Sequence, residues 1–264
     1  MSKWRLINAL TLAGMLVVNA LANALPLNGK NTGEISDSYP VLFTPAGYVF
    51  SIWGLIYLAL IGFAVFQALP GQRSNAHINR IGGWFALSNI LNLAWLFAWH
   101  WEVLWLSVIF MLGLLSCLLI IYTRLEIGLH AQTSPLEQAL VDFPFSLYLG
   151  WISVATIANV SAALYASGWN GYGLAPQVWT VIMIIVTAIL GLLMIQRRNA
   201  LTYPAVLIWS LIGIRVRPGQ NEMVGTAASA AAFLLLLYLT FRLLRERQLE
   251  FIRARGTRPT DQPK

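Results

Sequence analysis

Tryptophan, tyrosine and asparagine recur in this sequence at spacings that place them on single faces of helices. Trp53 and Tyr57 are four residues apart, and Trp151, Ala155 and Asn159 follow one another at intervals of four. Residues three or four apart share one face of a helix. Indole rings stack on flat apolar groups, and side-chain amides donate and accept hydrogen bonds, so the pattern favours non-covalent binding of a flat, mainly apolar ligand.

A third stripe consists of Asn89, Asn92, Trp95 and Trp99, and Tyr148 lies one turn before Trp151. The predicted ligand-binding residues are Trp53, Tyr57, Asn92, Trp95, Tyr148, Trp151, Ala155 and Asn159. The alternative for the asparagines is hydrogen bonding between helices, and the alternative for Trp53 and Trp151 is core packing. Three further indoles, Trp99, Trp101 and Trp105, are expected to form an interfacial aromatic belt.

The sequence contains no recognisable catalytic set. Cys117 is the single cysteine, and the three histidines are in separate loops, so no metal site is expected. Glu102, Asp142 and Glu222 lie at or near the ends of apolar segments rather than inside them, which argues against ion-coupled transport. We therefore expect no catalytic residues, no required cofactor and no dedicated enzymatic activity.

The elements that carry these side chains are predicted to be membrane-spanning helices. Of the 264 residues, 58% are hydrophobic and 10% are charged, whereas soluble domains are about 25% charged. Eight segments have the apolar length of spans or approach it: Trp4–Leu25, Gly47–Leu69, Ile81–Trp99, Glu102–Thr123, Leu140–Ala166, Pro176–Gln196, Leu201–Ile214 and Glu222–Leu244. The seventh is short and contains Pro204, so it could be broken or re-entrant. The predicted fold is an all-α polytopic bundle of about eight helices.

The distribution of basic residues predicts the orientation of this bundle. With the N-terminus in the cytoplasm, 14 of the 17 Lys and Arg are cytoplasmic, and only Lys30, Arg215 and Arg217 lie outside. The net charge of +7 is then mainly a topology signal, with some attraction of the tail to anionic membrane lipid, and no nucleic-acid partner is expected. We expect an integral protein of a bacterial plasma membrane with both termini in the cytoplasm.

Two segments at the N-terminal end have alternative interpretations. The first span could be a signal peptide ending near Ala22-Asn23-Ala24, but its apolar stretch is longer than usual and its asparagines favour a retained helix. The outside loop Pro26–Ala46 could cover the ligand pocket or be an ordinary connector.

Three of these motifs resemble those of the translocator protein family, the tryptophan-rich sensory proteins. The run Thr44-Pro45-Ala46-Gly47-Tyr48-Val49-Phe50-Ser51-Ile52-Trp53-Gly54-Leu55-Ile56-Tyr57 is similar to the second-helix signature of that family. Asn92-Leu93-Ala94-Trp95 resembles its third-helix motif, and the run from Trp151 to Asn159 resembles its fifth-helix motif. The resemblance covers roughly residues 1–170. It implies a five-helix bundle that binds porphyrins and other tetrapyrroles, sterols and synthetic aromatic compounds, with Trp53 and Trp151 matching indoles tied to porphyrin binding and breakdown.

The sequence departs from that family in its C-terminal third. No Lys or Arg lies between Asn159 and Pro176, where the sterol motif of the family is expected, and helices six to eight have no counterpart in five-helix members. We predict a ligand-binding bundle over residues 1–170, three additional helices over 171–245 and a basic tail over 246–264. The small-residue run Gly225–Ala232 is expected to pack onto the first five helices, with self-association as the alternative.

Together these features predict a membrane receptor or binding protein for tetrapyrrole-like or other flat apolar ligands. One alternative is a facilitator for an apolar metabolite. The other is porphyrin degradation through the pocket tryptophans.

Overall fold

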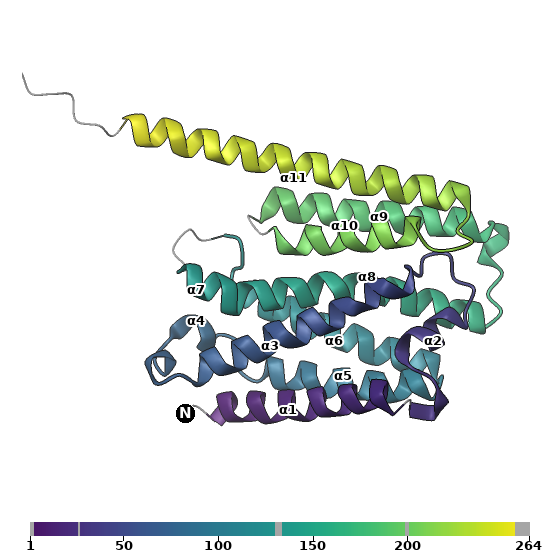
Figure 1. The fold of residues 1–264 in the computed structure, drawn as a ribbon, viewed down its shortest axis with the longest axis horizontal. Coiled ribbons are helices and arrows are strands. Elements are labelled where there is room, and N and C mark those ends of the chain that lie inside the picture. The colour runs from purple at the N-terminus through teal and green to yellow at the C-terminus, as the bar shows by residue number, and fades with distance from the viewer. Residues whose placement is uncertain (1–2, 26, 130–133, 199–200, 257–264) are drawn as a thin grey trace, which may run out of the picture.

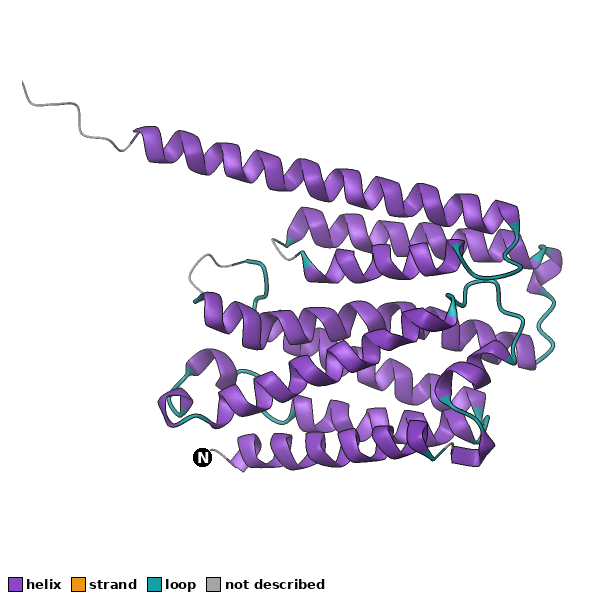
Figure 2. Ribbon diagram, viewed as in Figure 1, coloured by secondary structure: helices purple, strands orange, loops and turns teal. Residues whose placement is uncertain are grey.

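The fold is a bundle of roughly parallel helices that alternate in direction (Figure 1). The computed structural model describes residues 3–25, 27–129, 134–198 and 201–256, and all regular structure within those ranges is helical (Figure 2). The predicted all-α membrane bundle is therefore confirmed.

Eight long helices form the bundle. They are α1 (Lys3–Ala24), α3 (Ile52–Ala68), α5 (Trp84–His100), α6 (Leu104–Arg124), α8 (Phe143–Ala166), α9 (Pro176–Arg197), α10 (Thr202–Arg215) and α11 (Glu222–Gly256). Short helices lie between them: α2 (Thr32–Asp37), α4 (Ala76–Asn79) and α7 (Pro135–Glu137). A 3₁₀ turn, η2 (Gly47–Ser51), leads into α3, and a π-helical turn, η4 (Gln138–Asp142), joins α7 to α8. The remaining 3₁₀ turns are η1 (Leu27–Gly29), η3 (Pro70–Gln72) and η5 (Gly171–Gly173).

Six helical runs in the described part of the chain are long and apolar enough to cross a bilayer. They are Lys3–Ala24, Gly47–Ala68, Leu104–Arg124, Pro135–Ala166, Pro176–Arg197 and Glu222–Arg245. The other two long helices are shorter: α10 has 14 residues, or about 21 Å at 1.5 Å per residue, against a hydrocarbon core of about 30 Å. Pro204 lies in the first turn of α10, where no intrahelical N–H is needed, so the helix is unbroken. Whether α10 crosses the membrane stays a prediction.

The last helix is longer than the sequence indicated. The predicted span ends at Leu244, but α11 continues to Gly256 and extends past the other helices (Figure 1). Its 35 residues correspond to about 52 Å, well over the thickness of the hydrocarbon core. The predicted basic tail therefore begins as a helix, and residues 257–264 lie outside the described residues.

The three C-terminal helices pack on one side of the other five. Helix α10 contacts α8, and α11 contacts mainly α9 and α10 (Figure 1). The small-residue run of α11 contributes Ala228, which is fully buried, and a Cβ at Gly191 of α9 would lie 2.6 Å from Leu235 of α11. The expectation that this run packs onto the first five helices was therefore wrong. The helix that carries the run packs on α9 and α10 instead, and small side chains permit such close contact.

Candidate ligand-binding site

Trp53, on the first turn of α3, lies at the centre of a group of aromatic rings from three helices. Its ring stacks on Tyr57 at a centroid distance of 5.5 Å and on Trp95 of α5 at 6.0 Å. Tyr148 and Trp151 of α8 present their edges to it at 6.0 and 6.1 Å. Stacked and edge-to-face arrangements at these distances are both attractive. The structure thus brings together five of the predicted residues from three separate sequence motifs.

A chain of hydrogen bonds that includes the hydroxyls of Tyr57 and Tyr148 joins four helices. The hydroxyl of Tyr57 donates to Oδ1 of Asn19 on α1 (2.8 Å), and Nδ2 of Asn19 donates to Oδ1 of Asn92 on α5 (3.0 Å). Nδ2 of Asn92 then donates to the hydroxyl of Tyr148 on α8 (2.9 Å). Asn92 and Tyr148 are fully buried.

Asn159 joins α5, α6 and α8 through its side-chain amide. Nε1 of Trp95 donates to Oδ1 of Asn159 (3.0 Å), and Nδ2 of Asn159 donates to Oγ of Ser107 on α6 (2.8 Å). Hydrogen bonds of this kind hold membrane helices in register, because an unpaired amide in hydrocarbon is costly. The amide of Asn159 thereby fixes the orientation of the Trp95 ring.

Two small adjoining cavities lie around Trp53. The outer cavity has a volume of about 270 Å³, and its walls include Asn19, Asn23 and Tyr57. The inner cavity has about 30 Å³ and is lined by Trp151, Ala155 and Asn159 among others. Both are bounded by Thr32, Phe50, Trp53 and Trp95. Sites for drug-sized ligands usually measure about 300–1,000 Å³, so a large flat ligand requires this site to open.

The indole N–H of Trp151 is a buried donor that is not hydrogen-bonded within the described part of the chain. The Trp151 ring makes edge-to-face contacts with Trp53 and with Phe50, whose centroid is 5.7 Å away. An unpaired buried donor costs about 1–3 kcal/mol, so a ligand that offers an acceptor here would remove that penalty.

Trp99 belongs to this site, although it was expected to be part of an aromatic belt. It is only 4% exposed, stacks on Trp95 at 6.0 Å and lines the inner cavity. Trp101 and Trp105 are 53% and 51% exposed, as belt residues are. The signal that separates Trp99 from them was present in the sequence, because Trp99 continues the helical stripe of Asn92 and Trp95.

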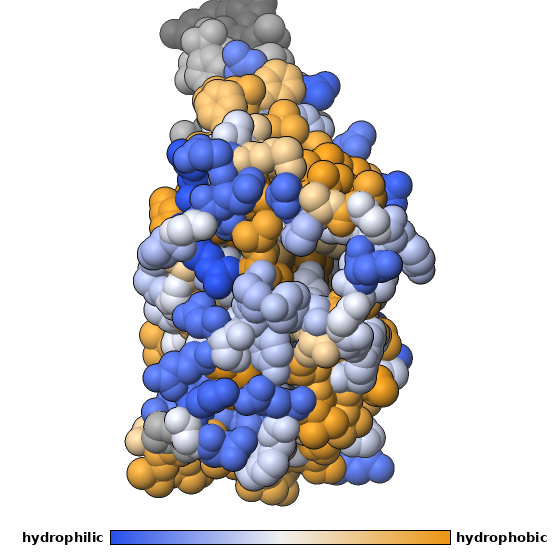
Figure 3. Space-filling view, turned by 90° about the vertical axis from the view of Figure 1, so that its right-hand side faces the viewer, coloured by the Kyte–Doolittle hydropathy of each residue, from blue (hydrophilic) through white to orange (hydrophobic). Residues whose placement is uncertain are grey.

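The loop between α1 and α3 covers the outer cavity. We define the cover loop as residues 27–46, which include η1 and α2. Asn31, Thr32, Gly33, Glu34 and Asp37 of this loop line the outer cavity. Figure 3 shows this end of the molecule, where hydrophilic residues lie between hydrophobic flanks. Of the two alternatives for this loop, the structure supports a cover over the cavity.

One side of the cover loop is fastened to the turn between α5 and α6. Nδ2 of Asn28 donates to the carbonyl of His100 (3.0 Å), while Lys30 and the hydroxyl of Tyr39 both donate to the carboxylate of Glu102, at 2.9 and 2.7 Å. These hydrogen bonds from Tyr39 and Lys30 lower the pKa of Glu102 below its ordinary value. Partial burial, with the neighbouring carboxylate, raises the pKa of Tyr39 to about 12.

The other side is fastened to the turn between α10 and α11. The guanidinium of Arg217 donates to the carbonyls of Val41 and Thr44, and Nε2 of Gln220 donates to the carbonyl of Leu42 (2.9 Å). The backbone N–H of Ala46 donates to the carbonyl of Gly213 (3.0 Å). Nothing in the sequence pattern indicated these contacts, because they join residues more than 160 positions apart.

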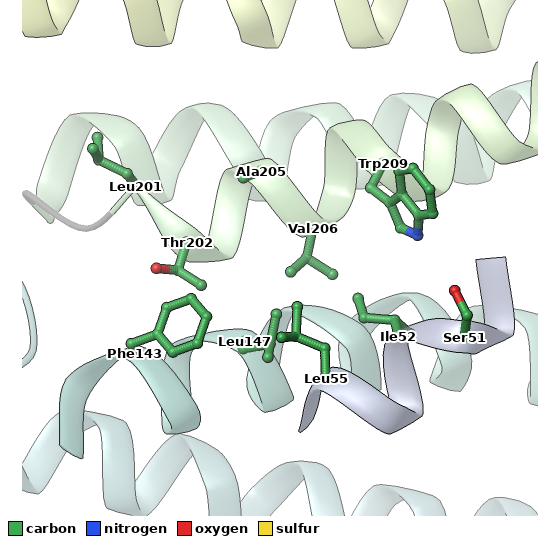
Figure 4. Close-up of a pocket in the computed structure, with 10 residues that line it drawn as sticks. All are labelled: Ser51, Ile52, Leu55, Phe143, Leu147, Leu201, Thr202, Ala205, Val206 and Trp209. Carbon is green, nitrogen blue, oxygen red and sulfur yellow. The ribbon is translucent and has the colours of Figure 1, made fainter. Parts of the chain in front are cut away.

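A larger apolar cavity of about 530 Å³ lies elsewhere, between α3, α8 and α10 (Figure 4). Its floor includes Ile52, Leu147 and Val206, which are buried, and Leu55 and Trp209 on its walls are exposed. It opens on the side of the bundle and contains none of the predicted ligand-binding residues. We therefore place the candidate site around Trp53.

Nothing in the described part of the chain resembles a metal centre, since no three His, Cys, Asp or Glu side chains there are grouped to hold an ion.

The model of one protein family, described as TSPO-like protein, matches residues 5–241 of this chain. No curated protein and no solved structure gives a significant match. The family match reaches into all eight long helices and ends within α11, so it includes most of the C-terminal region that had no counterpart in the resemblance.

Proposed function

Because this chain belongs to the TSPO-like family and forms a bundle of apolar helices, we propose that it is a membrane binding or sensory protein for flat, mainly apolar aromatic ligands of the tetrapyrrole type. In this proposal the ligand lies between α3, α5 and α8, beneath the cover loop. We further propose a bacterial plasma membrane location, with the cover loop outside and both termini in the cytoplasm.

The observation that carries the proposal is the set of rings around Trp53. Trp95 and Tyr57 lie within 6.0 Å of the Trp53 ring and nearly parallel to it, with interplanar angles of 28° and 29°. All three residues line the wall of one cavity. Each aromatic contact with a ligand ring adds about 0.5–1.5 kcal/mol beyond the burial of its area.

The role of each remaining residue follows from its contacts. Trp151 supplies the unpaired N–H at the inner end, and Ala155 supplies a small wall that leaves room beside it. Asn92, Tyr148 and Asn159 hold the aromatic residues in position through their hydrogen bonds. Entry of a large ligand requires the cover loop to move, because the outer cavity has only about 270 Å³ when closed.

Titration of the purified protein in detergent tests this proposal. The probe is protoporphyrin dimethyl ester, a neutral tetrapyrrole, and the signal is quenching of tryptophan fluorescence. We expect saturable binding at one ligand per chain and quenching that is retained when the exposed residues Trp101 and Trp105 are both replaced by Phe. Quenching that rises linearly without saturation, as it does on partition into micelles, would contradict a defined site.

A further inference from the structure

At the end of the bundle that carries the cover loop, three of the described carboxylates form ion pairs with Lys or Arg and one does not. Lys30 pairs with Glu102 at 2.9 Å. Arg215 pairs with Glu222 at 3.6 Å, and Arg217 pairs with Asp37 at 3.7 Å. The loops at this end contain no further Lys or Arg. Glu34 is the remaining carboxylate, and no described cation forms an ion pair with it.

Glu34 is held in place by the N-terminus of α2. Its Oε2 accepts a hydrogen bond from the backbone N–H of Asn31 (2.7 Å), while Oδ1 of Asn31 accepts from the backbone N–H of Glu34 (3.0 Å). This reciprocal pair is a capping box. It fixes the carboxylate at the wall of the outer cavity and leaves Oε1 without a hydrogen-bond partner among the described residues.

The outer cavity therefore has two unlike ends. Its inner wall consists of the rings of Trp53, Tyr57 and Trp95, and its outer wall includes Glu34 and Asp37. No Lys or Arg is among the residues that line it. Arg217 offsets the charge of Asp37, but no described cation is paired with Glu34. An anionic group beside Glu34 would therefore meet a like charge, whereas an ammonium or amide N–H could donate to its free oxygen.

We propose that Glu34 makes this site select aromatic ligands whose polar end is cationic or neutral over ligands whose polar end is anionic. The inference rests on the proposed function, since it assigns the polar end of the same ligand. It sets an order among tetrapyrroles with one ring system: a diamine-bearing derivative first, a neutral diester next and the free dicarboxylate last.

The experiment compares three porphyrins with the same ring: protoporphyrin, its dimethyl ester and an amide derivative with two aliphatic amines. Each is titrated against the full chain and against Glu34→Gln. Gln retains a capping box at this position, so the variant removes the charge and keeps the local structure. The matched control is Glu137→Gln, which removes a carboxylate from the second capping box, at Ser134 on the opposite end of the bundle.

For Glu34→Gln we expect the Kd of the dicarboxylate to fall about three- to tenfold and the Kd of the diamine to rise by a similar factor, as the Coulomb energy of charges several ångströms apart in a wet site implies. The Kd of the neutral ester should stay within twofold of its wild-type value. Because each ligand is compared between the variant and the wild type, its partition into micelles affects both values equally. Both changes should shrink at 0.5 M salt, because exposed charges are screened. Glu137→Gln should leave all three values unchanged.

Two results would overturn the proposal, and they differ in what else they overturn. If the ester binds saturably but the three Kd values keep the same ratios in Glu34→Gln, the charge selection is wrong and the binding function stands. If none of the three porphyrins binds saturably to the wild-type chain, both the charge selection and the binding function are wrong.

Discussion

The guanidinium of Arg217, in the turn between α10 and α11, donates hydrogen bonds to the carbonyls of Val41 and Thr44 in the cover loop. The C-terminal helices thus hold the loop that lies over the aromatic cavity. This contact gives helices beyond the first five a place in the account of ligand binding, because the closed cavity is smaller than a large flat ligand requires.

Replacing Arg217 by Met should speed the release of a bound ligand. Met keeps much of the side-chain volume but cannot donate to the loop carbonyls. We therefore expect the dissociation rate to rise about 5- to 30-fold, equivalent to about 1–2 kcal/mol for charge-assisted hydrogen bonds. Stopped-flow fluorescence measures the rate. Arg215→Met is the matched control, since Arg215 is the last residue of α10 and, among the described residues, pairs with the exposed Glu222 rather than with the cover loop. Equal rates in the two variants would show that Arg217 does not hold the loop.

Replacing Asn159 by Leu should lower the stability of the bundle. The change removes the acceptor of the Trp95 indole and the donor to Ser107. It leaves the buried N–H of Trp95 without its acceptor, whereas Ser107 still donates to the carbonyl of Leu104. Hydrogen bonds between membrane helices average about 0.6 kcal/mol, so we expect a loss of about 1–2 kcal/mol. The Tm in detergent measures this loss. Ser116→Ala is the control, because Ser116 is exposed and bonds only within its own helix. A Tm for Asn159→Leu equal to that of the control would contradict this role.

The attachment of the cover loop to Glu102 should depend on pH. Because the pKa of Glu102 is lower in the folded protein, its contribution to stability is present above the ordinary value of about 4.3 and is lost as the pH falls through the lowered pKa. Because the pKa of Tyr39 is raised to about 12, its contribution is present below about 10 and is lost as the pH rises through about 12. We expect the release rate of a neutral ligand to be flat between about pH 5 and 10 and to increase below about pH 4. The variant Glu102→Gln should abolish the acid increase, and an unchanged acid increase in that variant would exclude Glu102 as its origin.

Adding a side chain at Gly213 should separate α10 from the start of the second long helix. A Cβ at Gly213 would overlap Cγ2 of Val49 in η2 and lie 3.1 Å from Cβ of Pro45, so α10 or η2 must shift. Overpacking of this kind costs about 1–3 kcal/mol. We expect Gly213→Ala to lower the Tm, whereas Gly14→Ala on α1, where nothing lies within 4 Å, should not lower it. A Tm for Gly213→Ala at or above that of Gly14→Ala would mean that this close approach is not required.

The sequence predicted the helical fold and the convergence of the aromatic residues for one physical reason. Apolar segments of bilayer length and helical stripes are local patterns, so the helices and the convergence of Trp53, Trp95 and Trp151 could be inferred without coordinates. Contacts made by loops could not be inferred in this way. The hydrogen bonds of Arg217 to the cover loop depend on the three-dimensional packing of segments far apart in the sequence. The burial of Trp99 was also misjudged, since depth near the membrane surface depends on whether a loop covers the ring. Helix α11 is longer than the predicted span because hydropathy marks only the apolar segment, which ends at Leu244. The helix continues beyond it through mostly polar residues to Gly256.

In the proposed complex, a flat apolar ligand binds against the indoles of Trp53 and Trp151. The most direct measurement is the Kd of protoporphyrin dimethyl ester for the double variant Trp53→Phe with Trp151→Phe, compared with Trp101→Phe with Trp105→Phe, whose replaced rings are exposed and lie outside the cavities. Each variant loses two tryptophans, so ligand absorbance rather than protein fluorescence reports binding in both. The account predicts that the first variant binds at least tenfold more weakly than the wild-type chain while the second binds within twofold of it. Equal affinity in the two variants would contradict the assignment of the site.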